Sequence, residues 1–381
     1  MRVIYVTTSI EENDYVEFSK AWSISLNPSN QNFHNKVIRS LATFNKVDVL
    51  SIRPFSRSKC SIKKLVAEEK TIGNINYHYL KISKSKSFRG VCLNKQVKKL
   101  MPKLINEEVV LVTDTINPRC VQLASYIKKN YEIPCLGICT DSPYNISGTN
   151  HLYTTFLMNN AKHFDGYICL TEGLNALYNK DNKPFLKIEG LVESNIEQQE
   201  VKGNYFFFGG ALLSRYGVYQ LIEAFKNIKG EDLSLLICGH HAEEELEEAI
   251  SEDSRIKYLG TLPVKEVLTL ESHAIANINP RPYDEQLDRY SVPSKTIEYL
   301  SSGAITISVR NSELQDQFSD CAIWINSNDV EDLSAAMKKV LSMSANERKK
   351  VAEKAKKTAN SLYSIEKIGK LLTDFLLTFI Q

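Results

Sequence analysis

Short runs of apolar residues alternate along the chain with longer segments whose apolar positions repeat every three or four residues. The first pattern is typical of strands buried on both faces, and the second of amphipathic helices. In the first half, the patterns predict strands over 2–7, 47–52, 75–80, 109–113, 134–139 and 167–170, and helices near 31–44, 91–105, 118–130, 150–162 and 172–180. This alternation favours a parallel sheet covered by helices on both faces.

The second half of the chain repeats this scheme. It predicts strands over 205–209, 233–238, 256–259, 274–278, 304–309 and 322–325, and helices near 216–228, 242–251, 264–271, 294–302 and 330–342. The polar stretch between the halves, which ends near Gly203, is typical of a domain boundary. We therefore expect an N-terminal domain over 1–195 and a second domain over 204–360. A C-terminal helix over 361–381, with one apolar stripe, is expected to cross back and dock on the N-terminal domain.

Composition places the chain among globular proteins, with 43% hydrophobic and 24% charged residues in 381. No window reaches the ~18 apolar residues of a membrane span. The first residues resemble a strand rather than a signal peptide. The eight cysteines contain no CxxC pair, which favours small buried residues in a reducing cytoplasm over a zinc site. A D-x-D metal dipeptide is also absent from the sequence.

The small net charge of +2 hides an asymmetry between the halves. Residues 1–200 carry 26 Lys+Arg against 19 Asp+Glu, a net +7, and the remainder carries a net −5. Within 59–103, twelve basic residues stand against two acidic ones. This stretch is either a solvated face or a surface that attracts an anionic membrane or a phosphate-bearing acceptor. Near-neutral overall charge and the lack of a recognisable motif argue against nucleic acid.

Glycines and polar residues stand where the strands of the second half end, and open α/β sheets bind ligands at such carboxyl ends. Gly209 and Gly210 would let the backbone approach a ligand closely. Arg215 stands where the next helix begins and would face a diphosphate, although a solvated arginine in a tight turn is the alternative. Candidates for contact with a nucleobase at later strand ends are Gly239, Tyr258 and Leu259.

The loop and helix after the fourth strand of the second half carry the most informative pattern. Arg281 lies in the polar loop, and Pro293 stands where a helix would begin. Ser294, Lys295 and Glu298 then share one helical face. The first N–H groups of a helix and its dipole favour an anion. Lys295 adds a positive charge for a phosphate, and Glu298 offers acceptors for ribose hydroxyls, so the segment predicts a nucleotide diphosphate site.

The order FFGG…RYG…LIEAF, LLICG, IKYLGTLP and INPR…YSVPSKTIEYLSSG resembles the nucleotide-sugar half of group 1 glycosyltransferases, glycosyltransferase family 4, in the branch with a Pro-Ser-Lys signature. The resemblance is strong over 204–310 and loose over 1–160. It implies the α/β GT-B fold, in which two Rossmann-like, doubly wound domains face a cleft. It also implies a nucleotide-sugar donor, retention of the anomeric configuration and no metal requirement.

Two positions depart from the pattern of that family. Its motif of two glutamates separated by seven residues has Glu298 as the second member but Tyr290 as the first. Gly210 and Tyr216 stand where the family carries a basic pair, so Arg215 and Lys295 are the available replacements.

In the first half, Asp141 follows a strand where the family often has a catalytically important group. The alternative for Asp141 is a capping role in a turn.

The resemblance therefore implies a retaining, metal-independent hexosyltransferase in which Arg215, Lys295 and Asp141 serve catalysis. No cofactor is expected beyond the nucleotide-sugar substrate, a UDP-sugar. The expected acceptor is a glycan or a lipid-linked saccharide of bacterial cell-surface polysaccharide biosynthesis. The expected location is cytoplasmic and peripheral at the inner face of the plasma membrane. Alternatives are a catalytically silent subunit that binds a partner or glycan, and an epimerase or phosphorylase of the same fold.

Overall fold

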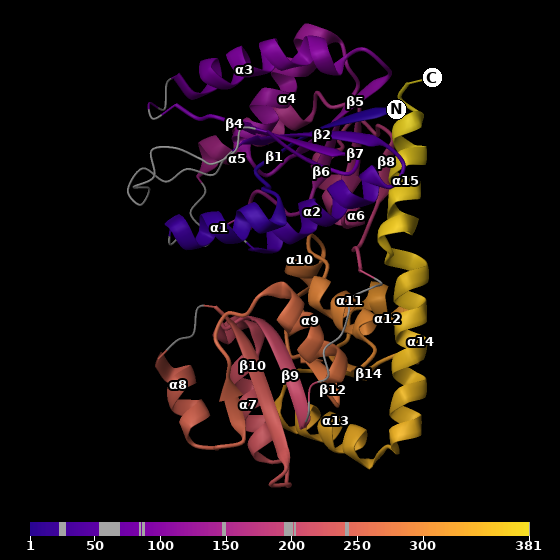
Figure 1. Cartoon of the computed structure of the whole chain (residues 1–381). Coiled ribbons are helices and arrows are strands. Elements are labelled where there is room, and N and C mark those ends of the chain that lie inside the picture. The colour runs from indigo at the N-terminus through magenta and orange to yellow at the C-terminus, as the bar shows by residue number, and fades with distance from the viewer. Residues whose placement is uncertain are drawn as a thin grey trace. The chain divides into compact units, whose positions relative to one another are not determined.

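The structure, a computed structural model, describes residues 1–22, 28–52, 69–83, 85, 88–146, 150–193, 201, 203–240 and 244–380. Most of the domain boundary expected within 193–204, and residues 59–68, 84, 86 and 87 of the basic stretch 59–103, therefore lie outside the described residues. The chain divides into two compact units (Figure 1). The first contains Met1–Leu191, Arg289–Val292 and Ile365–Gln381, and the second contains Val192–Asp288 and Pro293–Ser364.

The first unit is built on one sheet with the strand order β3-β4-β2-β1-β5-β6-β7-β8. All neighbouring strands are parallel except the antiparallel pair β3 and β4. The strands are β1 (Arg2–Thr7), β2 (Lys46–Ile52), β3 (Glu69–Ile72), β4 (Ile75–Leu80), β5 (Val109–Asp114), β6 (Cys135–Cys139), β7 (Gly166–Cys169) and β8 (Phe185–Lys187). The six strands predicted from the sequence are confirmed, and β3 and β8 were not predicted.

Helices cover both faces of this sheet (Figure 1). They are α1 (Glu12–Trp22), α2 (Pro28–Ala42), α3 (Arg89–Leu104), α4 (Pro118–Tyr131), α5 (His151–Ala161), α6 (Glu172–Tyr178) and α15 (Ile365–Leu377). One hydrophobic core joins the sheet to α3, α4, α5 and α6, and another joins its opposite face to α2 and α15. A Cβ on Gly369 of α15 would lie 2.1 Å from the carbonyl oxygen of Ser40 in α2. Glycine therefore allows these two helices to pack backbone to backbone.

The second unit has an all-parallel sheet with the order β11-β10-β9-β12-β13-β14. Its strands are β9 (Asn204–Ala211), β10 (Leu233–His240), β11 (Ile256–Tyr258), β12 (Ala276–Asn279), β13 (Ile305–Val309) and β14 (Ile323–Ile325). Its helices are η2 (Ser214–Tyr216, a 3₁₀ turn), α7 (Val218–Lys226), α8 (Glu244–Ser251), α9 (Val264–His273), α10 (Glu285–Asp288), α11 (Ser294–Ser302), α12 (Ser312–Gln317), α13 (Val330–Ser342) and α14 (Ala345–Tyr363). Alternate aromatic residues of β9 enter opposite cores, because successive strand side chains point to opposite faces.

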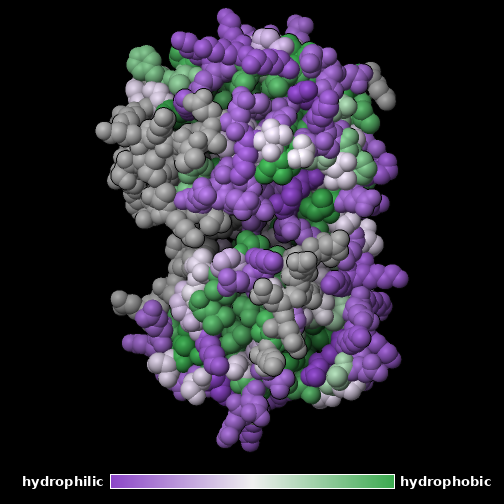
Figure 2. Space-filling model, in the orientation of Figure 1, coloured by the Kyte–Doolittle hydropathy of each residue, from purple (hydrophilic) through white to green (hydrophobic). Residues whose placement is uncertain are grey.

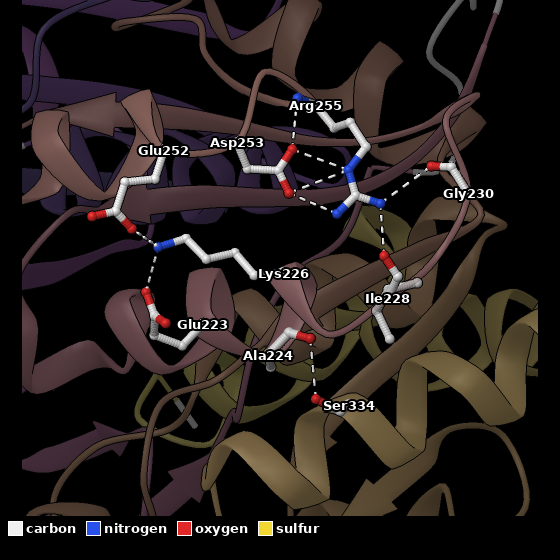
Figure 3. A network of polar contacts seen from close by, with 9 residues as sticks. All are labelled: Glu223, Ala224, Lys226, Ile228, Gly230, Glu252, Asp253, Arg255 and Ser334. Atoms are coloured by element: carbon white, nitrogen blue, oxygen red, sulfur yellow. Dashed lines mark hydrogen bonds and ion pairs between the residues drawn. The ribbon is translucent and has the colours of Figure 1, made fainter.

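A polar network ties the connections of the second unit together on its surface (Figure 3). Arg255 forms a bidentate ion pair with Asp253 and donates to the carbonyl oxygens of Ile228 and Gly230, at 2.6 and 3.2 Å. Its guanidinium also lies 4.9 Å from the ring centroid of Phe225. The planar guanidinium therefore fixes the turn after α7 to the turn before β11, which no local pattern in the sequence indicated.

Six of the cysteines in the described residues are buried as free thiols, as expected from the sequence. Among the described residues, no helix combines the length and apolar character needed to cross a bilayer.

Candidate functional site

The segment with the strongest sequence pattern forms the start of α11 in the second unit. Pro293 stands immediately before the helix with a φ of −72°, which suits a helix entry. Gly303 ends the helix in the left-handed conformation, with a φ of 93°. No side chain of the described residues caps the start of α11, and Ser294 there is exposed. The first N–H groups of α11 are thus positioned as an anion site requires.

Lys295 lies between two carboxylates at this helix start. Its Nζ is 3.3 Å from Oε2 of Glu298 and 3.4 Å from Oε1 of Glu271, a residue of α9. The Glu271 side chain is fully buried, whereas 34% of the Lys295 side chain is exposed. Burial by itself would lower the pKa of Lys295, but Glu298 and Glu271 outweigh it and raise that pKa well above its ordinary value. The ammonium is therefore charged and partly open to a ligand.

Tyr299 connects this cluster to the end of β9. Its hydroxyl accepts a hydrogen bond from the Gly209 N–H at 2.9 Å, and its ring centroid lies 5.8 Å from Nζ of Lys295. A Cβ on Gly209 would approach Sγ of Cys238 to 3.2 Å. Burial raises the pKa of the Cys238 thiol to about 11 against the opposing effect of Lys295. The structure thus brings Lys295, Glu298 and Gly209 together, as the sequence suggested.

The glycines at the ends of β9 and β10 lie side by side. Gly210 and Gly239 are in register, and Gly239 has a φ of +153°. A Cβ on Gly239 would lie 1.7 Å from the Gly210 carbonyl oxygen, so only glycine fits. Tyr258 donates its hydroxyl to the Gly239 carbonyl at 3.0 Å, and the Leu259 N–H donates to Ile237 at 2.8 Å. Both of these donor groups are therefore engaged within the unit.

Arg215 lies in the exposed turn η2, between β9 and α7. Its guanidinium stacks over the ring of Tyr216, 5.1 Å from the centroid, and forms no ion pair with a carboxylate of the described residues. The following Gly217 has a φ of 79°, and a Cβ there would lie 2.2 Å from the carbonyl oxygen of Pro280. This close approach holds the Arg215 turn beside the loop that follows β12.

Arg281 in that loop is paired with a carboxylate, because its Nη2 lies 2.7 Å from Oδ1 of Asp288. Burial is the main cause of a raised pKa of Asp288. The two side chains line a small, open pocket at the ends of β12 and β13. The other residues that line it are Asn279, Pro282, Tyr283, Pro293, Ser308, Val309, Arg310 and Asn311.

Two of the predicted site residues belong to the first unit. Tyr290 lies in the segment Arg289–Val292 and packs against the core that includes α6. The carbonyl oxygen of Arg289 accepts a hydrogen bond from the Thr171 hydroxyl at 2.8 Å. Asp141 follows β6, and its Oδ1 accepts from the Ser142 N–H at 2.7 Å. This bond reaches only the next residue, whereas a capping carboxylate bonds an N–H two or three residues on, so the capping alternative for Asp141 stays a prediction.

Sequence reasoning did not identify Glu271, Tyr299 or Cys238 as neighbours of Lys295. Tyr299 follows Lys295 by one helical turn, which was a usable signal. Glu271 comes from a helix 24 positions earlier, and nothing local marks it.

A second set of buried polar residues was also not predicted, in the first unit. Nδ1 of His34 lies 2.7 Å from the Tyr5 hydroxyl, and its Nε2 lies 3.6 Å from Oδ2 of Asp114. Burial lowers the pKa of His34. This group lies in the interior of the unit, with the imidazole fully buried.

Within the described residues, no group of three or more metal-ligating side chains occurs. Residues 192–358 match the family model of glycosyl transferases group 1. Among curated protein sequences, none matches the chain.

Several solved structures are similar in fold over almost the whole chain. Sucrose-phosphate synthase from Thermosynechococcus elongatus is 11% identical, with a TM-score of 0.70 and 99% of each chain covered. A trehalose-6-phosphate protein from E. coli, bound with UDP-2-fluoro glucose, is 10% identical, with a TM-score of 0.68 and 99% of each chain covered. Anabaena HepE in complex with UDP is 11% identical, with a TM-score of 0.64, and 99% of this chain and 100% of that chain are covered. The prediction of the GT-B fold, with two Rossmann-like α/β domains, is confirmed by these similarities.

Proposed function

We propose that the protein is a retaining glycosyltransferase of the hexosyltransferase type that takes its sugar from a UDP-sugar. The observation that carries this proposal is the cluster of Lys295, Glu298 and Glu271 at the start of α11, beside Gly209. The cluster lies within the residues that match group 1 glycosyl transferases. The titles of two similar structures name UDP or UDP-2-fluoro glucose as their ligand, which supports UDP as the nucleotide.

The charges in the cluster suggest how a donor would bind. One ammonium faces two carboxylates, a local charge of −1, which by itself would repel a diphosphate. Ribose hydroxyls that donate to Glu298 would draw this carboxylate away from Lys295. The Lys295 ammonium would then turn toward a phosphate while it keeps its contact with Glu271. Arg215, exposed and without a carboxylate partner among the described residues, would supply the second cation.

In this proposal, catalysis rests on positioning and charge stabilisation. Negative charge accumulates on the diphosphate as the bond to the sugar breaks, and Lys295, Arg215 and the first N–H groups of α11 would stabilise it. The acceptor hydroxyl attacks on the face that the nucleotide leaves, and a phosphate oxygen takes its proton. No protein nucleophile is needed, and the side-chain cations take the part that a metal would play. Asp141 of the first unit is proposed to orient the acceptor.

The remaining donor contacts are proposed for the strand ends of the second unit and for residues within 281–294. The glycines at the strand ends would let their backbone approach the nucleotide. Because the Tyr258 hydroxyl and the Leu259 N–H are engaged, the ring of Tyr258 and the carbonyl of Leu259 would contact the base. The other residues assigned to the donor are Gly209, Gly210, Gly239, Arg281, Tyr290, Pro293 and Ser294.

Thermal unfolding with a panel of UDP-, GDP- and dTDP-sugars tests the donor site. A ligand at 100 times its Kd stabilises the folded state by roughly 2.7 kcal/mol, so UDP-sugars should raise the Tm. Lys295→Ala and Glu298→Ala should lose this shift, while Lys265→Ala, an exposed change on α9, should keep it. If no nucleotide stabilises the wild type, the donor site is wrongly assigned. UDP binding without transfer to any glycan would instead favour a catalytically silent subunit.

The proposed acceptor is a glycan or lipid-linked saccharide, in the assembly of bacterial cell-surface polysaccharide at the inner face of the plasma membrane. The basic stretch of the first unit supports this setting, since cations near an anionic bilayer gain about 1 kcal/mol each. Incubating the protein with bacterial membranes and radiolabelled UDP-sugars tests it. Label should enter the lipid extract, and label found only in water-soluble glycans would exclude a lipid-linked acceptor.

A further inference from the structure

Helix α3 of the first unit presents a cationic face that carries apolar side chains. The helix has five cations and no acidic residue, and no Asp or Glu occurs between residues 70 and 106. Its cations are Arg89, Lys95, Lys98, Lys99 and Lys103. In Figure 2 the surface over α3, at the top of the view, is mainly hydrophilic, with scattered hydrophobic side chains.

Packing fixes which face of α3 points outward. Leu93, Val97, Met101 and Leu104 are buried against the core of the unit. Gln96 adds two hydrogen bonds to the backbone of Lys81, at 2.8 and 2.9 Å, which hold the helix against the segment after β4. The rotation of α3 is therefore set, and the residues opposite this buried stripe face solvent.

The outward face combines lysines with apolar side chains in one arc. At 100° per residue, Lys95, Lys98, Lys99 and Lys103 lie opposite the buried stripe, and all four are exposed. Val91, on the same arc, is 65% exposed, and Phe88, which precedes the helix, is 64% exposed. Further along the arc, Pro102 and Ile105 are also exposed. Phe88 and Val91 therefore add exposed apolar area to a face whose lysines are not neutralised.

The four lysines have no carboxylate partner within the part of the chain that the structure describes, in contrast to Lys70, which contacts Glu11 and Asp14 at 2.6 and 2.9 Å. A second helix adds positive charge nearby, because Arg89 is close enough to Arg119 of α4 to affect its titration. The positive potential over α3 is thus not cancelled locally. Such a potential attracts an extended anionic surface more strongly than it attracts a single anion.

We propose that the outward face of α3 is the surface by which the protein docks on an anionic lipid bilayer. The lysines lie over the phosphate headgroups, and Phe88 and Val91 enter the boundary between headgroups and acyl chains. This inference deepens the membrane setting proposed above but does not depend on the donor chemistry. At roughly five-fold per cation, four lysines account for a partition coefficient near a thousand-fold above that for neutral lipid.

Co-sedimentation with vesicles tests the proposal on the full-length protein. Wild type should bind phosphatidylcholine vesicles that contain about 30% phosphatidylglycerol, which gives a strongly anionic surface. It should not bind pure phosphatidylcholine vesicles. Lys95→Glu, Lys98→Glu and Lys99→Glu together should weaken binding by at least about a hundred-fold. The matched control replaces three exposed lysines of the second unit, Lys338, Lys339 and Lys350, with glutamate. This variant should bind the vesicles as wild type does.

The apolar part of the surface has its own test. Phe88→Ser with Val91→Ser should weaken binding by roughly ten-fold without changing the salt dependence. Phe88→Trp should show a blue-shifted emission on anionic vesicles and quenching by brominated lipids. The proposal is overturned if wild type does not bind anionic vesicles at low salt, or if the α3 variants bind them as well as the control does. It is also overturned if α3 proves to be a contact between copies of the chain. A UDP-induced rise in Tm, measured for every variant, shows independently whether the donor site is intact.

Discussion

Replacing Lys295 with methionine should separate its structural contribution from its proposed catalytic one. Its ammonium lies 3.3 and 3.4 Å from the carboxylates of Glu298 and Glu271. At an effective dielectric constant of about 20, each contact corresponds to a gross attraction of roughly 5 kcal/mol before desolvation is subtracted. Removing one member of a buried pair costs about 3–5 kcal/mol. Because a third of the Lys295 side chain is exposed, we expect Lys295→Met to lower the free energy of unfolding by about 2–3 kcal/mol.

A double variant distinguishes the two roles. Glu271→Gln should restore most of the stability of Lys295→Met, since it removes the buried charge that has lost its partner. Turnover should remain about 10²–10³-fold lower in both, because the cation that faces the diphosphate is still missing. Urea denaturation at pH 7 and UDP release from the donor measure the two quantities. Because the pKa of Lys295 is raised in the folded state, its contribution to the free energy of unfolding is complete below pH 10.5. The contribution disappears as the pH rises through the folded-state pKa.

Equal stability of Lys295→Met and wild type would show that the ion pairs do not hold the ammonium in place. Restoration of turnover by Glu271→Gln would show that Lys295 acts only by neutralising Glu271. Either result refutes the reasoning behind the proposed diphosphate site.

Other predictions address the glycine edge, a titrating pair and the surface network. Gly239→Ala should destabilise the protein by more than about 2 kcal/mol, because the new Cβ would collide with the Gly210 carbonyl. Gly260→Ala, at a φ of +68° with open space around it, should cost only about 1–2 kcal/mol. Equal losses of stability in thermal unfolding would contradict this prediction. Burial would lower the pKa of His78, but the Asp48 carboxylate, 2.8 Å away, outweighs it and raises that pKa. His78→Gln should therefore destabilise the protein most below pH 6.5, and the loss should fade as the pH rises through the raised pKa. A difference in urea midpoints that does not change with pH would contradict this prediction. In urea denaturation, Arg255→Ala should lower the free energy of unfolding by about 2 kcal/mol, because it removes the bond to the Ile228 carbonyl. Lys226→Ala removes only a surface ion pair and should lower it by less than about 1 kcal/mol. The reverse order would show that the carbonyl contacts of Arg255 are unimportant.

The apolar patterns of the sequence determined the order and type of the main elements, because the periods of two and 3.6 residues are local properties of the backbone. They also placed Lys295 and Glu298 on one face of α11, since positions three apart in a helix are neighbours whatever surrounds them. Apart from the 11-residue helix α1, the elements that were missed are short, such as β8 and α10, or lie at sheet edges, such as β3. Such elements carry too few residues to show a period.

Only the tertiary structure decided which distant groups meet. Glu271 reaches Lys295 from another helix, and Tyr299 bonds to Gly209 across 90 positions, because β12 and β9 pair side by side and their flanking helices share one face. Likewise, Tyr290 lies in the second half of the sequence but packs into the first unit. Contacts of this kind depend on shape and burial over the whole fold, which local spacing along a chain does not encode.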